Sequence, residues 1–270
     1  DRDLITSVQA LETDRIKDFG YKTNKTGFEF GSSFEHLEDL YITPMFSTYY
    51  ESVETSASAS SSLKKQEGSY LDIKGSYKID IDKRNQAYKP SDGFRSQFTQ
   101  VIPLNIDSNQ TIVNGYELNS YYEYLPDVVG AISLYGRAAN SFGDDDVRIS
   151  DRLYLPSKKL RGFEPGKIGP VDNGDFIGGN FNTALNISSE LPILESMETT
   201  SFNVFFDVAN VWGVDYSSAI NDSSAIRSAT GIGIDWYTPV GPLSFTLSQP
   251  IAQKSTDKTE SFRFNLGTTF

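Results

Sequence analysis

Hydrophobic and polar residues alternate along most of the chain. In the segment 70–81, Leu71, Ile73, Tyr77 and Ile79 are separated by polar residues, and the same period of two recurs in segment after segment. Successive side chains of a β-strand point to opposite faces of the sheet, so this period predicts strands with one apolar and one polar face. We predict twelve strands, near 2–11, 27–36, 41–54, 69–82, 93–103, 111–124, 128–142, 176–191, 200–213, 226–238, 242–250 and 260–270.

The connections between these strands alternate in length. Short turns at one end of a sheet and long loops at the other are typical of an up-and-down antiparallel topology. No linker or break in composition divides the chain, so we expect one domain. The short connections are 36–40, 125–128 and 238–242, and the long polar ones are 14–26, 53–68, 143–175, 214–225 and 252–260.

An all-β chain with this pattern can adopt two architectures. A soluble β-sandwich buries the apolar face between two sheets, whereas a transmembrane β-barrel turns it toward lipid and keeps the polar face inside. Many of the predicted strands have the length that a tilted strand needs to cross a bilayer. Aromatic residues gather at predicted strand ends, as at Tyr49, Tyr50, Tyr122 and Tyr124, where the membrane interfaces would lie. These features favour an antiparallel up-and-down transmembrane β-barrel.

The composition narrows the chemistry. Among the 270 residues, 36 acidic side chains outnumber 24 basic ones, and the net charge of -12 argues against a nucleic-acid partner. The chain has no cysteine and a single histidine, His36, which excludes disulfides, zinc–thiolate sites and a cysteine nucleophile. No constellation of residues is typical of an enzyme. We therefore expect no catalytic residue, no metal and no cofactor.

The longest predicted loop contains Leu160-Arg161-Gly162-Phe163-Glu164-Pro165, followed by Ile168-Gly169-Pro170. This segment resembles the R-G-F loop motif of the BamA family of bacterial outer-membrane protein assembly factors. Four further segments resemble that family in order and spacing, and together they cover the chain from residue 88 to its end. These segments are Tyr88-Lys89-Pro90-Ser91-Asp92-Gly93-Phe94-Arg95, Phe205-Phe206-Asp207-Val208-Ala209-Asn210-Val211-Trp212, Ile226-Arg227-Ser228-Ala229-Thr230-Gly231-Ile232, and Trp236 through Pro250.

The resemblance implies a domain organisation. The family's barrel has sixteen strands preceded by periplasmic POTRA domains. Residues 1–270 would then be a C-terminal outer-membrane β-barrel domain without the POTRA domains and without the first strands of the barrel. The chain starts at Asp1 rather than at Met, so we expect a processed product or a fragment.

The resemblance also implies a function, the folding and insertion of β-barrel proteins into the bacterial outer membrane. The implied partners are unfolded outer-membrane proteins, outer-membrane lipid and accessory lipoproteins of an assembly complex. The first alternative is a passive transport or two-partner secretion barrel that moves a solute or polypeptide. The second is a soluble β-sandwich binding domain.

The candidate functional residues lie in the long loop and on two predicted strands. By the resemblance, Arg161, Gly162 and Phe163 would fold back into the barrel, where the arginine would pair with an inner-wall carboxylate. Counting in twos along the strands puts Glu190 and Asp207 on polar faces, and the resemblance makes both of them partners of Arg161. The last strand ends in alternating apolar residues, which the resemblance interprets as an insertion signal: Phe262, Phe264, Leu266 and Phe270.

Overall fold

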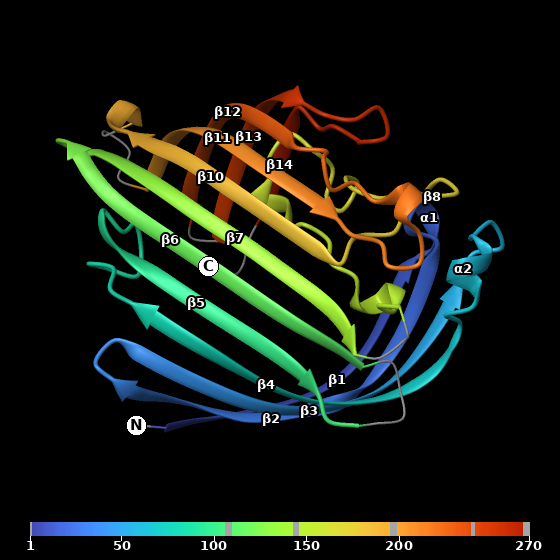
Figure 1. Cartoon of the computed structure of the whole chain (residues 1–270). Coiled ribbons are helices and arrows are strands. Elements are labelled where there is room, and N and C mark those ends of the chain that lie inside the picture. The colour runs from blue at the N-terminus through green and yellow to red at the C-terminus, as the bar shows by residue number, and fades with distance from the viewer. Residues whose placement is uncertain (1, 106–109, 143–145, 195–198, 239–240, 267–270) are drawn as a thin grey trace.

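The computed structural model describes residues 2–105, 110–142, 146–194, 199–238 and 241–266. Twelve strands form one antiparallel sheet, in the order β1-β2-β3-β4-β5-β6-β7-β10-β11-β12-β13-β14. The sheet curls strongly, so that β1 to β4 lie across an interior from β10 to β14 (Figure 1). The predicted all-β, up-and-down antiparallel architecture with twelve strands is confirmed.

The strands are long, and a few short elements lie in the connections. The connections hold α1 (Ile16–Phe19), α2 (Ser61–Lys64), the two-stranded sheet of β8 (Val171–Asp172) and β9 (Asp175–Phe176), and four short 3-10 turns. The strands of the large sheet are β1 (Arg2–Arg15), β2 (Tyr21–Leu37), β3 (Leu40–Thr55), β4 (Gly68–Asp82), β5 (Asp92–Pro103), β6 (Gln110–Leu125), β7 (Val128–Phe142), β10 (Phe181–Leu191), β11 (Thr200–Trp212), β12 (Arg227–Thr238), β13 (Gly241–Ala252) and β14 (Phe262–Leu266).

Two predicted boundaries are wrong. The segment 14–26 is not a long loop, because β1 and β2 pair without a break up to Arg15 and Tyr21. The outward residues of this part are polar, and Glu12 and Lys22 form an ion pair at 2.7 Å. An apolar period is therefore missing although the backbone is extended. The predicted strand 176–191 begins only at Phe181, since the preceding residues belong to β9 and the loop.

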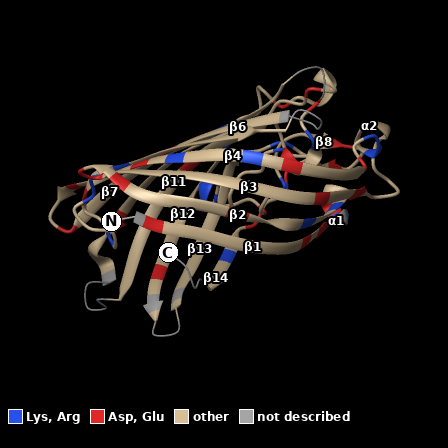
Figure 2. Cartoon of the chain, turned by 90° about the horizontal axis from the view of Figure 1, so that it is seen from below, with Lys and Arg blue, Asp and Glu red and all other residues tan. Residues whose placement is uncertain are grey.

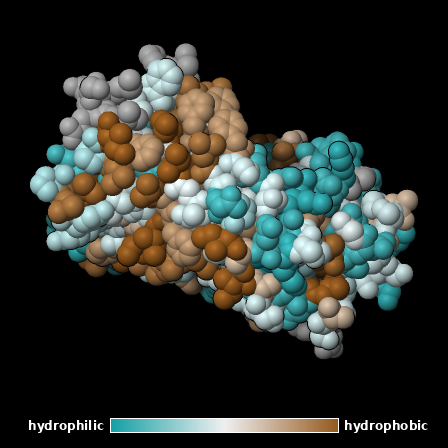
Figure 3. Space-filling view, turned by 90° about the horizontal axis from the view of Figure 1, so that it is seen from above, coloured by the Kyte–Doolittle hydropathy of each residue, from teal (hydrophilic) through white to brown (hydrophobic). Residues whose placement is uncertain are grey.

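The two faces of the sheet differ as the alternation predicts. Outward side chains include many exposed large apolar residues, such as Leu71, Ile132, Phe206 and Leu247. Figure 3 shows apolar side chains over the strands and polar side chains toward the end that carries the long loops. Charged residues are concentrated near the strand ends, above all at the end with α1, α2 and β8 (Figure 2). The apolar band is the surface that a bilayer would cover.

The sheet has two edges among the described residues. β1 pairs with β2 alone, and β14 pairs with β13 over five residues, from Leu247↔Phe262 to Leu243↔Leu266. No pairing joins β1 to β14 in the part of the chain that the structure describes. Within the same described ranges, no helix has the length and apolar character required to cross a membrane.

The buried apolar core is built largely by the connection between β7 and β10. This segment turns into the interior of the curled sheet (Figure 1). Its apolar residues pack on small side chains of the inner wall, which leaves room for the backbone to approach closely. One cluster contains Leu155, Leu160, Phe163 and Ile168 from the connection with Ala184, Ala209, Val211 and Ala229 from β10, β11 and β12.

Candidate functional site

The connection between β7 and β10 is held against the inner wall at several points. Leu153 and Gly179 exchange backbone hydrogen bonds at 2.7 and 3.0 Å, which ties the start of the connection to its end. Two 3-10 turns, Ile149–Asp151 and Ser157–Lys159, lie before and after Leu153. The residues after the second turn, 160–168, then lie on β10 to β13. We call residues 157–168 the inner loop.

Arg161 of the inner loop is bound to Asp207 of β11. Its Nε and Nη2 donate to the two carboxylate oxygens of Asp207 at 2.8 and 2.7 Å, and its backbone N–H donates to the same carboxylate at 3.0 Å. The Arg161 guanidinium carbon lies 3.5 Å from the centre of the Phe205 ring. Such a two-pronged contact fixes direction as well as distance, because a planar guanidinium matches a planar carboxylate.

Asp207 is placed by the register of β10 and β11. It is fully buried, on the inner face directly opposite Asn186. Asn186 donates from Nδ2 to Asp207 at 2.9 Å and to the carbonyl of Lys159, also at 2.9 Å. The buried carboxylate thus receives four hydrogen bonds, three of them from Arg161, and a carboxylate out of water requires such compensation.

Gly162 and Phe163 bring the loop backbone onto the wall. Gly162 has φ +90°, a conformation that side chains with a Cβ rarely adopt. A Cβ built on it would lie 3.1 Å from the Cβ of Ala229 and 3.2 Å from that of Ser248. Phe163 is 2% exposed and forms an isolated β-bridge with Thr259. The motif is therefore a close backbone contact as well as an ion pair.

The opposite side of the inner loop is fastened to the last strand. Arg263 of β14 donates to the carbonyls of Ser157 at 3.0 Å and Phe163 at 2.5 Å, and it pairs with Glu260 at 2.7 Å. Backbone bonds run parallel to this contact, with the N–H of Glu260 donating to the carbonyl of Gly162 at 3.0 Å. The inner loop therefore spans the wall from β11 to β14.

Further ion pairs close the end of the interior where the long loops meet. Arg148 is 1% exposed and pairs with Glu51 and Asp72, which come from β3 and β4. Arg227 is fully buried and pairs with Asp222 and Asp257, each of which lies in a loop. Buried charges of this kind are compensated by partners with good geometry.

Two loop carboxyls have shifted pKa values. Burial raises the pKa of Asp215, but the N–H of Val147 and the charge of Arg152 lower it by more, so its pKa lies below the ordinary range. Burial together with the charges of Asp172 and Asp18 raises the pKa of Asp175. One Asp175 oxygen has no hydrogen-bond partner in the structure. Protonation of Asp175 therefore favours the folded state, whereas protonation of Asp215 disfavours it.

Comparison with known proteins identifies the family. The Omp85 superfamily domain matches residues 2–270. The chain belongs to the Omp85 superfamily. Among curated proteins, it is 24% identical over 260 residues to the "Outer membrane protein assembly factor BamA" of Neorickettsia risticii, a match that covers 93% of this chain and 34% of that protein. It is 27% identical over 192 residues to the human "Sorting and assembly machinery component 50 homolog", over 66% of this chain and 41% of the human protein.

Two solved structures share the fold. The structure of BamA from Haemophilus ducreyi lacking POTRA domains 1-3 superposes with a TM-score of 0.84 and 20% identity, over 97% of this chain and 58% of that one. CdiB from Acinetobacter baumannii gives a TM-score of 0.54 and 13% identity, over 91% of this chain and 42% of that one. The chain thus spans about a third to two fifths of the curated relatives named above.

The loop motif contacts only one of its two expected partners. Arg161 lies on Asp207, but Glu190 does not join them. Its carboxylate lies 3.8 Å from Lys89 instead. Glu190 faces Asn203, four residues along β11 from Asp207, which corresponds to about 13 Å at 3.3 Å per residue. The prediction that Glu190 contacts Arg161 is wrong. Counting in twos along a strand gives the face on which a side chain lies, but not its position along the strand.

Two residues that bind the inner loop, Asn186 and Arg263, were not predicted from the sequence. Asn186 occupies the place expected for Glu190, and it shares the inner face with it at the same parity. Arg263 lies on the polar face of the last strand, between Phe262 and Phe264. The alternation places both residues on a polar face, but it does not single out either of them as a partner of the inner loop.

The apolar residues of the last strand face outward. Phe262, Phe264 and Leu266 are 53%, 50% and 62% exposed. Phe270 lies outside the described residues. No group of three or more potential metal ligands occurs in the described part of the chain. The insertion-signal role of these apolar residues stays a prediction.

Proposed function

We propose that this chain is the barrel portion of a bacterial outer-membrane protein assembly factor, which folds and inserts other β-barrel proteins. The family, the assembly-factor names of the BamA and component 50 relatives, and the BamA-like fold support this proposal. The protein resides in the bacterial outer membrane. The observation that carries the proposal is the docked inner loop, in which Arg161 is bound to Asp207 inside the barrel wall.

The inner loop acts as a brace. It is fixed at β11 through Asp207 and at β14 through Arg263, so it holds four neighbouring strands at a set spacing. Strands held in this way can keep the edge strand β14 in a defined position while an incoming protein moves beside it. Bond-making chemistry is not part of this role, and no catalytic residue is assigned.

The brace matters for function because the sheet, as far as the structure describes it, has an unpaired edge strand. An unpaired strand exposes backbone N–H and C=O groups, and each of these costs several kcal/mol in hydrocarbon. A barrel with an accessible edge can pair with an incoming strand and so lower the cost of inserting it. Local thinning of the bilayer beside the edge lowers that cost further. The partners are unfolded outer-membrane proteins, surrounding lipid and accessory lipoproteins.

The test is depletion of the native full-length protein in its own bacterium. We expect the folded amounts of several unrelated outer-membrane barrels to fall together, with unfolded precursors accumulating in the periplasm. A plasmid copy should restore them, and a copy with Arg161→Glu should not. Lys158→Glu is the matched control, since Lys158 is an exposed cation of the same loop. Unchanged barrel levels after depletion would overturn the proposal.

A transport barrel is the second candidate. The likeness to CdiB, at a TM-score of 0.54, favours it less than the BamA likeness favours assembly. The inner loop also fills part of the interior that a passive channel would need. Large ion conductance in planar bilayers, combined with unchanged levels of other barrels after depletion, would support transport.

A further inference from the structure

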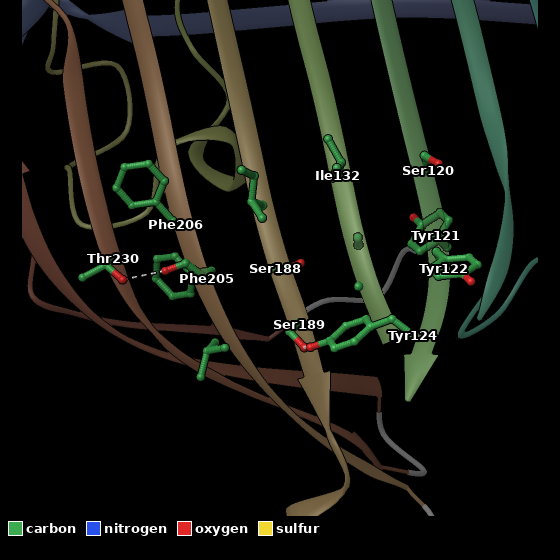
Figure 4. Close-up of a pocket in the computed structure, with 14 residues that line it drawn as sticks. Ser120, Tyr121, Tyr122, Tyr124, Ile132, Ser188, Ser189, Phe205, Phe206 and Thr230 are labelled. Carbon is green, nitrogen blue, oxygen red and sulfur yellow. Dashed lines mark hydrogen bonds between the residues drawn. The ribbon is translucent and has the colours of Figure 1, made fainter. Parts of the chain in front are cut away.

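A groove opens on the outward face of the sheet across β6, β7, β10, β11 and β12. Its volume is about 540 Å³. Figure 4 shows its lining side chains on these strands, with Tyr122 and Tyr124 on one side and Phe206 on the other. Most of its lining is apolar, and it forms part of the apolar band described above.

The strand registers show that the groove faces away from the interior. One row of directly paired residues crosses all five strands, namely Ser120, Ile132, Ile187, Phe206 and Thr230. Ile132, Ile187 and Phe206 are 50%, 44% and 40% exposed. The neighbouring inward row contains Phe205, which carries the Arg161 guanidinium on its inner side. The groove and the inner loop therefore lie on opposite sides of one wall.

Small residues create the hollow. In the next outward row, Gly130 and Ser189 are paired side by side between Tyr122 and Val204. A Cβ at Gly130 would lie 3.3 Å from the ring of Tyr124, so that ring lies over the glycine. The Tyr124 hydroxyl is 2.7 Å from the Ser189 hydroxyl. This hydroxyl pair forms one end of the groove, close to the short turn between β6 and β7.

We propose that the groove binds the acyl chain of a phospholipid from the leaflet on the short-turn side. The groove belongs to the apolar surface of an outer-membrane protein, where water is excluded and lipid is the neighbouring phase. Its five strands span four steps of about 4.8 Å, roughly 19 Å in all. Strands in such barrels are tilted, so a chain that follows the membrane normal crosses several of them, as this groove does.

The hydroxyl pair gives the lipid a polar anchor. Tyr124 lies in the part of the strand where aromatic residues meet the membrane interface, which is also the depth of lipid ester groups. One hydroxyl donates to the other, so one O–H of the pair remains to donate to an ester carbonyl. The acyl chain then extends from Tyr124 toward Phe206 and Thr230.

The experiment compares lipid retention by three full-length proteins. Wild type, Ser189→Phe and Thr48→Phe are extracted from membranes, exchanged into mild detergent and examined by native mass spectrometry. Ser189→Phe fills the groove. Thr48→Phe is the matched control, because Thr48 lies on the outward face of β3 opposite Phe28. We expect wild type and the control each to retain about one phospholipid per protein. The amount retained by Ser189→Phe should be at least tenfold lower.

A second variant and a binding assay keep the result interpretable. A variant with both Ser189→Ala and Tyr124→Phe leaves the groove open and removes both hydroxyls, so we expect about fivefold weaker rebinding of phospholipid to delipidated protein, the factor of one net hydrogen bond. The soluble headgroup alone should not bind. Equal retention by wild type, Ser189→Phe and Thr48→Phe would overturn the proposal and assign the bound lipid to the general boundary layer. Retention of a polypeptide instead of lipid would overturn it as well.

Discussion

Arg161 and Asp207 share one contact with three donors. The guanidinium grips both carboxylate oxygens, at 2.8 and 2.7 Å, and the backbone N–H of the same arginine reaches the carboxylate at 3.0 Å. Asp207 is fully buried, while the Arg161 side chain keeps 21% of its surface exposed. The strand therefore holds a fixed negative charge, and the loop supplies the positive charge that compensates it.

Removal of the Arg161 side chain should destabilise the protein strongly. Arg161→Ala leaves the buried Asp207 carboxylate without its cation, which typically costs about 3–5 kcal/mol. Arg161→Lys keeps the charge but not the two-pronged geometry, so its loss should be smaller. Urea unfolding of the protein in lipid vesicles measures both effects. Lys158→Ala is the control, and an Arg161→Ala variant as stable as this control would contradict the assignment.

Gly162 should tolerate alanine less well than Gly174. Both glycines have positive φ, at +90° and +94°, so alanine adds similar backbone strain at each. A Cβ at Gly162 meets Ala229 and Ser248 at 3.1 and 3.2 Å, whereas a Cβ at Gly174 meets nothing within 4 Å. We expect Gly162→Ala to release the inner loop and to speed its cleavage by added protease. Equal cleavage rates in the two variants would show that strain alone matters.

Arg263 should couple the inner loop to the last strand. Arg263→Ala removes the donors to Ser157 and Phe163, so amide hydrogen exchange in β14 should accelerate. The same acceleration should follow Arg161→Ala, and the double variant should add little to either single change. A coupling energy of about 0.5–3 kcal/mol is expected for residues in one network.

The control for this cycle is Arg95→Ala. Arg95 is also an arginine paired with a carboxylate, Asp80, but it lies on β5. It should leave exchange in β14 unchanged. Strict additivity of Arg161→Ala and Arg263→Ala would mean that the loop holds the two strands independently.

Asp175→Asn should stabilise the protein near neutral pH. The pKa of Asp175 is raised in the folded state by burial and by Asp172 and Asp18. Folding is therefore favoured below the ordinary carboxyl pKa, and this advantage is lost as pH rises through the folded pKa. The variant has no such loss, so its unfolding midpoint in urea should exceed that of wild type at pH 7. The difference should vanish at a pH below the ordinary carboxyl pKa.

Asp215→Asn should behave in the opposite way. The pKa of Asp215 is lowered in the folded state, so it contributes stability above its ordinary pKa that is lost as pH falls through the folded value. The variant should be less stable than wild type at neutral pH and equal to it in strong acid. A common direction for Asp175→Asn and Asp215→Asn would contradict the two pKa shifts.

The alternation of side chains locates all twelve strands in their order, but not all of their ends. It failed where both faces of a strand are polar, as in the hairpin from Glu12 to Asn24, because no apolar period marks an extended backbone there. Parity also put Asp207 on the inner face. Which residue of β10 lies opposite Asp207 depends on the register between β10 and β11. This register is fixed by the connection between the two strands rather than by the pattern of either strand. Glu190 was therefore expected where Asn186 lies.

The contacts of Arg263 had no signal in the pattern. They depend on how the loop backbone folds, since Arg263 binds the carbonyls of Ser157 and Phe163 and not their side chains. Backbone carbonyls are the same at every residue, so no residue type announces such a partner. The motif predicted that the inner loop would dock but not where its far end would be fastened.

The sequence distances spanned by the inner loop set an order of folding. Arg161 finds its partner 46 residues further along the chain, and Phe163 is bound by a residue 100 positions later. The loop precedes both partners in the chain, so its contact with Arg263 requires β14 to be in place. Contacts that close over such distances form late, because the chain between them must first be ordered. We therefore expect the inner loop to dock late, onto a wall that is already in place.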